Sequence, residues 1–473
     1  MKTHPVYLNG DFVSTEETLS VRNPATNEEV GRMSCISRER VAKAIFDAHQ
    51  AFKHWRQVTS KSRGELLSNL AEKLEQRRSE IARTITLESG KPLSQSLGEV
   101  AMSVAHLRWF AEEARRAYGR IIPPMVDGKR HLVIKSPLGV VAAITPWNFP
   151  LMLAVRKVGA ALAAGCTVIL KPSEVTPMTS VLLAECIDAT SPPQNVFQLV
   201  MGDSPDLAAE FAANPLCRKI SFTGSTATGR QLIALAAATA KPLLLELGGN
   251  APVLVFDDAD LYPTADAIVL AKFRNGGQSC IAANRIYVQR KIYDDFLQAF
   301  TSRVIELQLG DGLEQNTDIG PLINQTAVAR AAEHVQDAVN GGARILCGGS
   351  ANHGPGNFFE PTVLADVPRG SLCMFEESFA PIAPVTVFER EEEAIELANG
   401  SAQGLAAYVF TRDVSRAFRL MDALEAGIIS VNDGMPTTSQ APFGGVKQSG
   451  WGRELGTEGL DAYMDTKHVS IGM

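Results

Sequence analysis

The chain has 473 residues, of which 45% are hydrophobic and 21% are charged. This composition is typical of a globular protein with several domains and excludes disordered, collagen-like and low-complexity chains. Lys and Arg number 45 against 52 Asp and Glu, a net charge of −7, so we expect no nucleic-acid partner.

The sequence carries no signal for a membrane, a secretory route or a metal. Its longest uncharged stretch, 136–155, contains Pro146 and Pro150 and so cannot form a continuous lipid-facing helix. No apolar run follows the N-terminus, so we expect no membrane partner and a cytoplasmic location. The seven Cys and eight His are scattered without metal-ligand spacing, so we expect no metal.

The first predicted elements are amphipathic helices between about Arg38 and Ala117. Val41, Ile45 and Ala48 lie on one helical face, and a leucine-rich face follows with charges between the apolar positions. A polar hinge near 123–130 ends this helical region.

Beyond the hinge, short apolar runs alternate with helical segments. The predicted strands are 140–144, 167–170, 196–200, 219–222 and 253–256, with helices at 173–189 and 226–238. Continuous apolar strands of this kind are typical of a parallel sheet that is covered on both faces. We therefore predict a doubly wound α/β domain.

A second alternation of strands and helices follows. Strands are predicted at 286–288, 384–388, 406–410 and 428–431, and helices at 291–307 and about 326–340. This is enough for a second α/β domain. The end of the chain, 463–473, has strand character, and such a strand usually pairs with another edge.

Two segments contain candidate catalytic side chains. Gly276 and Gly277 leave Cys280 on a tight loop, where a thiol is either a nucleophile or simply a small buried apolar group. Glu246 ends an apolar strand before a Gly-Gly turn. It is either a buried carboxylate bonded to main-chain N–H groups or a general base with a raised pKa.

Three further segments follow predicted strands, where open α/β sheets place ligands. Asn148 offers amide donors between two prolines, or else forms a turn that caps the next helix. The segment 222–230 starts a helix whose N–H groups suit a pyrophosphate, although ordinary strand-helix turns look similar. In 171–174 a Lys and a Glu suit ribose hydroxyls, or else mark a capped helix start.

Together these segments resemble the aldehyde dehydrogenase superfamily. The motifs PWNFP, KPSE, FTGSxxxG, ELGG, GQxC, EExF and PFGGxKxSGxGRE occur in that family's order from about residue 7 to the C-terminus. The resemblance implies an α/β fold with a doubly wound parallel-sheet dinucleotide-binding domain, an α/β catalytic domain and a small β oligomerisation arm. The implied ranges are 1–118 and 138–246, then 247–445, then 119–137 with 446–473, and the implied assembly is a homodimer or homotetramer.

The resemblance also implies a role for each matching residue. Cys280 resembles the nucleophile that forms a thioester, Glu246 the base that hydrolyses it, and Asn148 a side chain of the oxyanion hole. The expected cofactor is NAD, with NADP as an alternative. The residues implied to hold it are Trp147, Lys171, Ser173, Glu174, Gly224, Ser225, Gly229, Leu247, Glu377 and Phe379. Ala380 stands where the family usually has Gly.

Two arginines indicate the substrate. Phe149, Met152 and Arg156 have the spacing of one helical face, and Arg274 lies six residues before Cys280. Both arginines lie in segments that resemble succinate-semialdehyde dehydrogenases.

Each arginine alone could equally be a helix-surface cation, but together they suit a carboxylate or a sulfonate. Thr437 keeps a hydroxyl that this subfamily often has as Ser. We therefore predict oxidation of a short anionic semialdehyde, best succinate semialdehyde. The alternatives are glutarate, malonate or sulfonated semialdehydes, a hydroxyaldehyde, or a catalytically silent binding protein.

Overall fold

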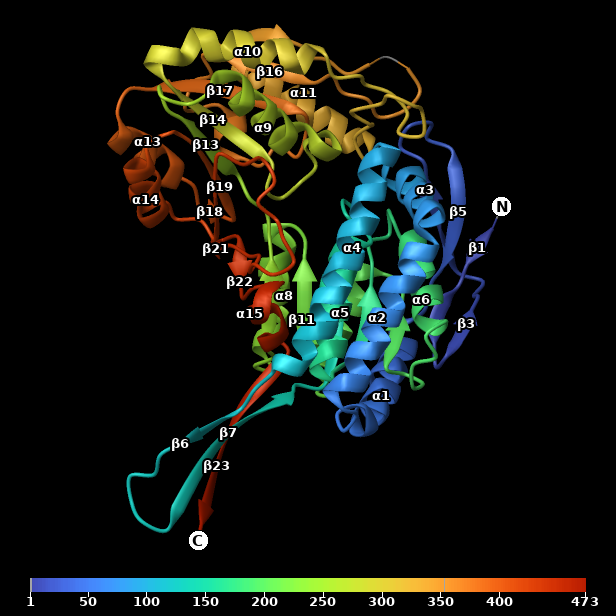
Figure 1. The fold of residues 1–473 in the computed structure, drawn as a ribbon. Helices are drawn as coiled ribbons and strands as arrows, with labels where there is room; N and C mark the ends of the chain where they lie inside the picture. Colours follow the sequence, from blue (N-terminus) through green and yellow to red (C-terminus); the bar gives the residue numbers. More distant parts are fainter. Residues whose placement is uncertain (1, 353) are drawn as a thin grey trace.

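The structure is a computed structural model that describes residues 2–352 and 354–473. Two large sheets, each packed between helices, form the body of the molecule, and a thin β arm leaves it (Figure 1). No helix in the described part of the chain is long and apolar enough to span a membrane.

The first sheet has eight strands in the order β22-β12-β11-β8-β9-β10-β2-β3. The five from β12 to β10 are parallel, and β22, β2 and β3 are antiparallel at the edges. Their bounds, in sheet order, are Gly450–Trp451, Leu243–Glu246, Cys217–Thr223, Val140–Ile144, Thr167–Lys171, Phe197–Leu199, Val6–Leu8 and Asp11–Val13. β8 and β9 are fully apolar apart from their ends, as burial on both faces requires.

Helices cover this sheet, and many come from the N-terminal region where the sequence predicted them. They are α1 Arg38–Trp55, α2 Ser60–Gln76, α3 Arg78–Ser89, α4 Leu93–Glu113, α5 Met152–Ala164, α6 Met178–Asp188, α7 Ser204–Ala213, α8 Thr226–Ala237 and α15 Gly456–Asp461. α6 begins later than the predicted 173–189 because Pro177 precedes it and the Glu88 carboxylate accepts its first N–H bonds.

The second sheet has seven strands in the order β15-β16-β17-β14-β13-β19-β20, parallel except at β15. Their bounds, in sheet order, are Arg344–Cys347, Thr362–Ala365, Ile382–Phe388, Ala283–Gln289, Ala251–Val255, Ala406–Phe410 and Ile428–Val431. Its helices are α9 Leu261–Phe273, α10 Tyr293–Ile305, α11 Gln325–Asn340, α12 Leu372–Phe375, α13 Glu391–Asn399 and α14 Val414–Ala423. The predicted strand 253–256 is thus β13, and it belongs to this sheet.

Smaller sheets complete the fold. β1 Thr3–His4, β5 Glu29–Ser34 and β4 Thr18–Arg22 form one sheet near the N-terminus, and β18 Gln403–Gly404 pairs with β21 Val446–Lys447. The arm contains β6 Arg120–Ile122, β7 Lys129–Pro137 and β23 Met464–Gly472, with β23 antiparallel to β7 along its whole length. In Figure 1 the C-terminus lies at the far end of this arm.

The fold predicted from the motifs, α/β with two wound parallel sheets, is confirmed. The domain boundaries stay a prediction. Within the span assigned to the arm, β22 pairs with β12 of the first sheet, so residues 450–451 contribute to that sheet.

Candidate active site

A cavity of about 430 Å³ lies between the carboxyl ends of the first sheet's strands and residues of the second sheet's region. The predicted site residues that line it are Trp147, Asn148, Gly224, Ser225, Glu246, Leu247, Cys280, Glu377 and Phe379. Side chains that the sequence placed in separate motifs therefore meet in one cavity.

The loop that carries Cys280 has an unusual backbone. After α9 ends, Asn275, Gly276 and Gly277 have φ values of 53°, 63° and 75°. A Cβ on Gly277 would lie 2.2 Å from the carbonyl oxygen of Ala380, whereas a Cβ on Gly276 would meet nothing closer than 3.6 Å. The loop therefore needs glycine at 277 for space as well as for conformation.

The Cys280 thiol is half-buried at this cavity. Burial raises its pKa to about 12, the Glu377 carboxylate adds to the rise, and Arg156 opposes it. No helix dipole favours the thiolate here, since the nearby α9 ends at Phe273 and presents its C-terminal, negative end to this loop. Deprotonation therefore needs a base or a bound cationic group.

Glu246 ends β12, between β11 and β22. Its side chain is buried, and neither carboxylate oxygen has a hydrogen-bond partner among the described residues. Burial raises its pKa well above the ordinary range, and the negative charge of Glu454 adds to the rise, while Lys157 and Arg156 oppose it. A buried acid of this kind is suited to accept a proton from water.

Asn148 lies in the turn between β8 and α5. Its Nδ2 donates to the carbonyl of Gln278 at 3.1 Å, while its own carbonyl accepts from the Nζ of Lys91 at 2.6 Å and the Nδ2 of Asn275 at 3.1 Å. The turn is thereby attached to the loop that carries Cys280. The amide Nδ2 has a second N–H, as an oxyanion hole needs.

The start of α8 fits the pyrophosphate of a dinucleotide. Ser225 caps the helix by accepting from the N–H of Thr228 at 3.2 Å, and the buried hydroxyl oxygens of Thr223 and Thr226 have no partner among the described residues. A Cβ on Gly229 would lie 2.6 Å from Leu247, so the helix sits close to the strand. Donors at a helix N-terminus favour an anion.

The predicted ribose residues lie together at the end of β9. The Nζ of Lys171 lies 2.6 Å from the Oε1 of Glu174, and the Ser204 hydroxyl contacts both groups. Ser173 forms a local turn by accepting from the N–H of Val175 at 3.3 Å. These residues do not line the 430 Å³ cavity that contains Cys280.

Glu377 and Phe379 line the 430 Å³ cavity from the segment between α12 and β17. Glu377 accepts from the N–H of Gly249 at 3.2 Å, and burial raises its pKa to about 7. Phe379 contacts Trp147 edge-on, with ring centres 5.5 Å apart and an interplanar angle of 83°. Ala380 is fully buried, and its carbonyl oxygen faces the loop glycine at 277.

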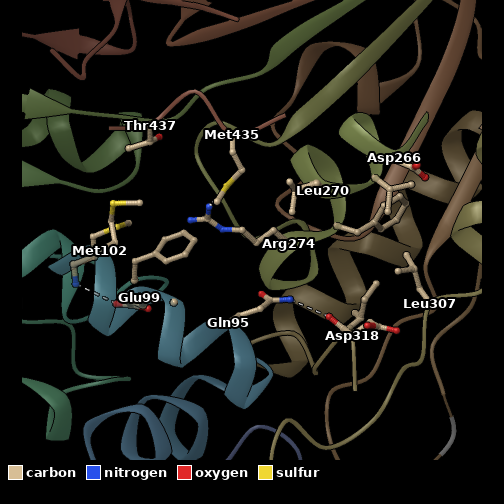
Figure 2. A pocket seen from close by; sticks show the side chains of 16 residues that line it. Gln95, Glu99, Met102, Asp266, Leu270, Arg274, Leu307, Asp318, Met435 and Thr437 are labelled. Carbon is tan, nitrogen blue, oxygen red and sulfur yellow. Dashed lines mark hydrogen bonds between the residues drawn. The ribbon is translucent and has the colours of Figure 1, made fainter. Parts of the chain in front are cut away.

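A second cavity, of about 410 Å³, is lined by Arg274 and Thr437. Arg274 lies in the middle of the lining, with the sulfur of Met435 directed toward its guanidinium (Figure 2). Its Nη1 lies 2.7 Å from that sulfur, and its guanidinium lies 4.9 Å from the centre of the Phe149 ring. Phe149, Met152 and Glu99 also line this cavity. The Cys280 thiol is close enough to Arg274 for its charge to act on the pKa of the arginine, so the two cavities adjoin along the segment that begins at Asn148.

Arg156 is not brought to either cavity. Its side chain is 2% exposed, lies 3.9 Å from the carboxylate of Glu454, donates to His106 at 3.4 Å and covers the ring of Phe443 at 4.4 Å. The predicted shared helical face is only partly present, because α5 begins at Met152 and leaves Phe149 outside the helix.

Sequence reasoning missed two buried ion pairs beside these cavities. Lys91 pairs with Glu99 at 2.6 Å, and Lys157 contacts Glu454 at short range. The sequence did contain a signal for Lys157, which follows Arg156 in an otherwise apolar helix. Burying an unpaired charge in such a helix would be costly, so a partner could have been expected. Lys91 gave no such signal, because it lies between Gly90 and Pro92 and not within an apolar run.

Comparison with known proteins agrees with this architecture. The profile of the aldehyde dehydrogenase family matches residues 12–469. The mitochondrial succinate-semialdehyde dehydrogenase of Arabidopsis thaliana is 47% identical over 456 residues, covering 96% of this chain and 86% of that protein. The glutarate-semialdehyde dehydrogenase of Pseudomonas putida is 44% identical, covering 99% of this chain and 97% of that protein.

Among solved structures, an Escherichia coli NADP-dependent enzyme is 44% identical and superposes with a TM-score of 0.98. The match covers 100% of this chain and 98% of that one. The family resemblance predicted from the motifs is therefore confirmed, and the chain belongs to the aldehyde dehydrogenase family.

Proposed function

We propose that this chain oxidises a short aldehyde with a terminal anion, succinate semialdehyde being the best candidate, with NAD as cofactor. One observation carries the choice of substrate. Arg274 lines the second cavity, and no carboxylate of the described residues forms an ion pair with it. Its guanidinium is therefore available to an anionic substrate tail.

The three carboxylates of this cavity have other partners than Arg274. Glu99 pairs with Lys91, Asp266 pairs with Arg303 at 2.8 Å, and Asp318 accepts from a main-chain N–H at 3.0 Å. A carboxylate tail would neutralise the charge of Arg274 and accept two hydrogen bonds from its guanidinium. The hydroxyl of Thr437 supplies a further donor at the same cavity.

Arg156 has a different part in this proposal from the one its spacing predicted. Because it is enclosed beside Glu454, we assign contact with the tail to Arg274 and Thr437 alone. Glutarate semialdehyde is the second candidate, since the Pseudomonas putida relative carries that name.

The reaction follows from three side chains at the cavity that contains Cys280. The Cys280 sulfur, once deprotonated, attacks the aldehyde carbon, and the carbonyl electrons move to oxygen as a C–S bond forms. The Asn148 amide and the N–H of Cys280 stabilise that oxyanion, each donor contributing roughly 3–4 kcal/mol. A nicotinamide ring held beside Trp147, Glu377 and Phe379 would supply the oxidant. The hydride would pass from the substrate carbon to that ring, and the substrate would remain as a thioester on Cys280.

Glu246 completes the reaction by accepting a proton from water. The resulting hydroxide adds to the thioester, the C–S bond breaks, and the acid leaves while Cys280 regains its thiol or thiolate form. The raised pKa of Glu246 makes its carboxylate a stronger base for this proton transfer than an exposed carboxylate would be. A base at this position favours hydrolysis over transfer of the acyl group to another thiol.

NAD is preferred over NADP in this proposal, and the preference is incomplete. Glu174 would accept from both ribose hydroxyls and repel a 2′-phosphate, while Lys171, only 2.6 Å away, reduces that repulsion. We further propose a homodimer or homotetramer built through the arm, and a cytoplasmic location, where the seven free thiols would stay reduced.

Substitution of Arg274 tests the substrate proposal. In Arg274→Met the KM for succinate semialdehyde should rise at least tenfold, while a neutral aldehyde of equal length is oxidised as well as before, because only the anionic tail loses its partner. The measurement is kcat/KM for both aldehydes, from NADH absorbance.

Arg274→Lys is the matched variant, since it keeps the positive charge but loses the paired N–H donors of the guanidinium. It should recover part of the preference for the anionic aldehyde. Equal losses on both aldehydes would mean that Arg274 is structural and that the tail is recognised elsewhere. Absence of NADH formation with every aldehyde would favour the catalytically silent alternative.

A further inference from the structure

A buried ion pair lies directly behind the turn that carries Asn148. Lys91 follows Gly90, which ends α3 with a φ of 77°, and Glu99 lies in the second turn of α4. The Nζ of Lys91 is 2.6 Å from the Oε2 of Glu99, and the two side chains are 0% and 1% exposed. Burying two charges offsets much of their attraction, so such a pair adds little to stability by itself. Its effect is better sought in the groups that it holds.

Lys91 holds the turn at Asn148 itself. Its ammonium donates to the Asn148 carbonyl at 2.6 Å and lies 4.1 Å from the centre of the Phe149 ring. A charge-assisted hydrogen bond of this length in a water-free environment strongly fixes the position of the acceptor. The main-chain carbonyl of Asn148 is therefore tied to this ammonium group.

Glu99 holds the other end of the same turn. Its Oε1 accepts from the N–H groups of Leu151 at 2.9 Å and Met152 at 3.1 Å, where α5 begins. Its Oε2 binds Lys91, so one carboxylate connects the start of the helix with the ammonium beneath Asn148. Figure 2 shows Glu99 at the edge of the second cavity, on the α4 helix.

The opposite face of the turn contacts the loop that carries Cys280. Asn275 and the carbonyl of Gln278 both bond to Asn148, so the main chain of residue 148 is clamped between that loop and Lys91. Loss of the Lys91 bond would leave the Asn275 bond alone to place this carbonyl. The amide of Asn148 could then turn away from the aldehyde oxygen.

We propose that Lys91, anchored by Glu99, is a positioning residue of the oxyanion hole that acts through Asn148. The proposal rests on the roles of Asn148 and Cys280 in the proposed function. A donor stabilises a developing oxyanion only if it is oriented before the reaction, and a displacement of about 1 Å can cost about a hundredfold in rate.

The test is Lys91→Met in the full-length enzyme, measured as the rate of the first NADH burst with the aldehyde that the unchanged enzyme oxidises best. We expect the burst to slow by about 10 to 100-fold, with cofactor binding changed by no more than about threefold. Lys91→Met with Glu99→Gln is the second variant, because it leaves no uncompensated buried charge if the single variant fails to fold. It should show the same slow burst.

A double-mutant cycle separates positioning from general damage. In an Asn148→Ala background, Lys91→Met should change the burst rate by less than about twofold, because the group through which Lys91 acts is absent. Glu88→Gln is the matched control. Glu88 is also a buried carboxylate of this region, but it accepts from the N–H groups of Met178 and Thr179 at the start of α6. The change in burst rate caused by Glu88→Gln should be the same with or without Asn148→Ala.

Two results would overturn the proposal: an unchanged burst in a folded Lys91 variant, or full additivity of Lys91→Met with Asn148→Ala. Neither result depends on which aldehyde is preferred, because the cycle can be run with a neutral aldehyde. The Arg274 variants report on the substrate independently, so failure of one proposal is distinguishable from failure of the other.

Discussion

Glu246 is the proposed general base, and the charged groups around it shift its pKa. It is buried at the end of β12, and the negative charge of Glu454 adds to the rise in its pKa that burial produces. A general base acts only after it has lost its proton, so a raised pKa moves the rising limb of activity to higher pH. The effect of Glu454 on the pKa of Glu246 should therefore be measurable in the pH dependence of kcat.

We predict that Glu454→Gln shifts the rising limb of kcat for thioester hydrolysis to lower pH. Removing the neighbouring negative charge lowers the pKa of Glu246, so more of it is deprotonated at a given pH. The measurement is steady-state kcat against pH, under conditions in which a prior NADH burst shows that hydrolysis limits turnover.

Glu246→Gln is the control for this shift. It should retain the NADH burst, accumulate the thioester on Cys280 and lose the rising limb altogether. A pH profile that is the same in Glu454→Gln as in the unchanged enzyme would mean that the limb reports another group. Loss of the burst in Glu246→Gln would place Glu246 earlier in the reaction, at the thiol.

Single residues also mark the limit of sequence-based prediction. Cys280, Glu246 and Asn148 could be predicted because each is in a short motif with its own backbone requirement, and the structure brings them to one cavity. Arg156 could not be placed by spacing, because a helix of thirteen buried residues offers no exposed face to distinguish. The carboxylate that encloses it, Glu454, is 298 positions further along the chain.

At the scale of elements, the loop between α9 and β14 is the most constrained part of the site. Gly276 and Gly277 both have positive φ, but only Gly277 is in contact range of the backbone of the segment that carries Glu377 and Phe379. Alanine at position 276 would cause backbone strain alone, whereas alanine at position 277 would cause the same strain and a steric clash. The two substitutions therefore form a matched comparison.

We predict that Gly276→Ala costs about 1 kcal/mol of stability and leaves kcat within about threefold, because its Cβ would make only ordinary van der Waals contacts, none closer than 3.6 Å. Gly277→Ala should lower kcat by more than tenfold, because its Cβ would lie 2.2 Å from the Ala380 carbonyl and one of the two segments must move. Thermal unfolding and kcat of both variants check this. Equal losses in the two would show that the contact with Ala380 is unimportant.

Elements were predictable where burial dictates their pattern. The central strands of both sheets are continuous apolar runs, so their positions agree with the structure to within a few residues. The strands before Arg38 gave no such pattern, since they are short, partly exposed and stabilised by pairing with distant segments such as β10. Which sheet receives β13 depends on long-range pairing, which local sequence does not contain.

At the scale of the whole molecule, the arm exposes apolar side chains and unpaired strand edges. Ile121 is 78% exposed and Met125 is 99% exposed, and both edge strands of the arm sheet, β6 and β23, lack a second neighbour among the described strands. Apolar surface and open strand edges together favour association with another copy of the chain.

We predict that Ile121→Lys dissociates the oligomer into smaller species, because a charge would be buried at the contact, while the unfolding of each subunit changes little. Sedimentation velocity at several concentrations measures the assembly. Phe418→Lys, at a residue that is 62% exposed on α14, is the control and should leave the assembly unchanged. An unchanged assembly in Ile121→Lys would move the contact away from the arm.

The pairing of β22 with β12 has a consequence for the order in which a growing chain acquires activity. β12 carries Glu246, and its outer edge is covered by Gly450 and Trp451, with Glu454 shortly beyond. During synthesis the N-terminal regions emerge first and begin to fold. Both large sheets can form most of their strands before residue 450 has left the ribosome, but the strand that carries the proposed base then still has an open edge. A nascent chain, or one cut short before β22, should therefore be folded in most of its parts and still be inactive.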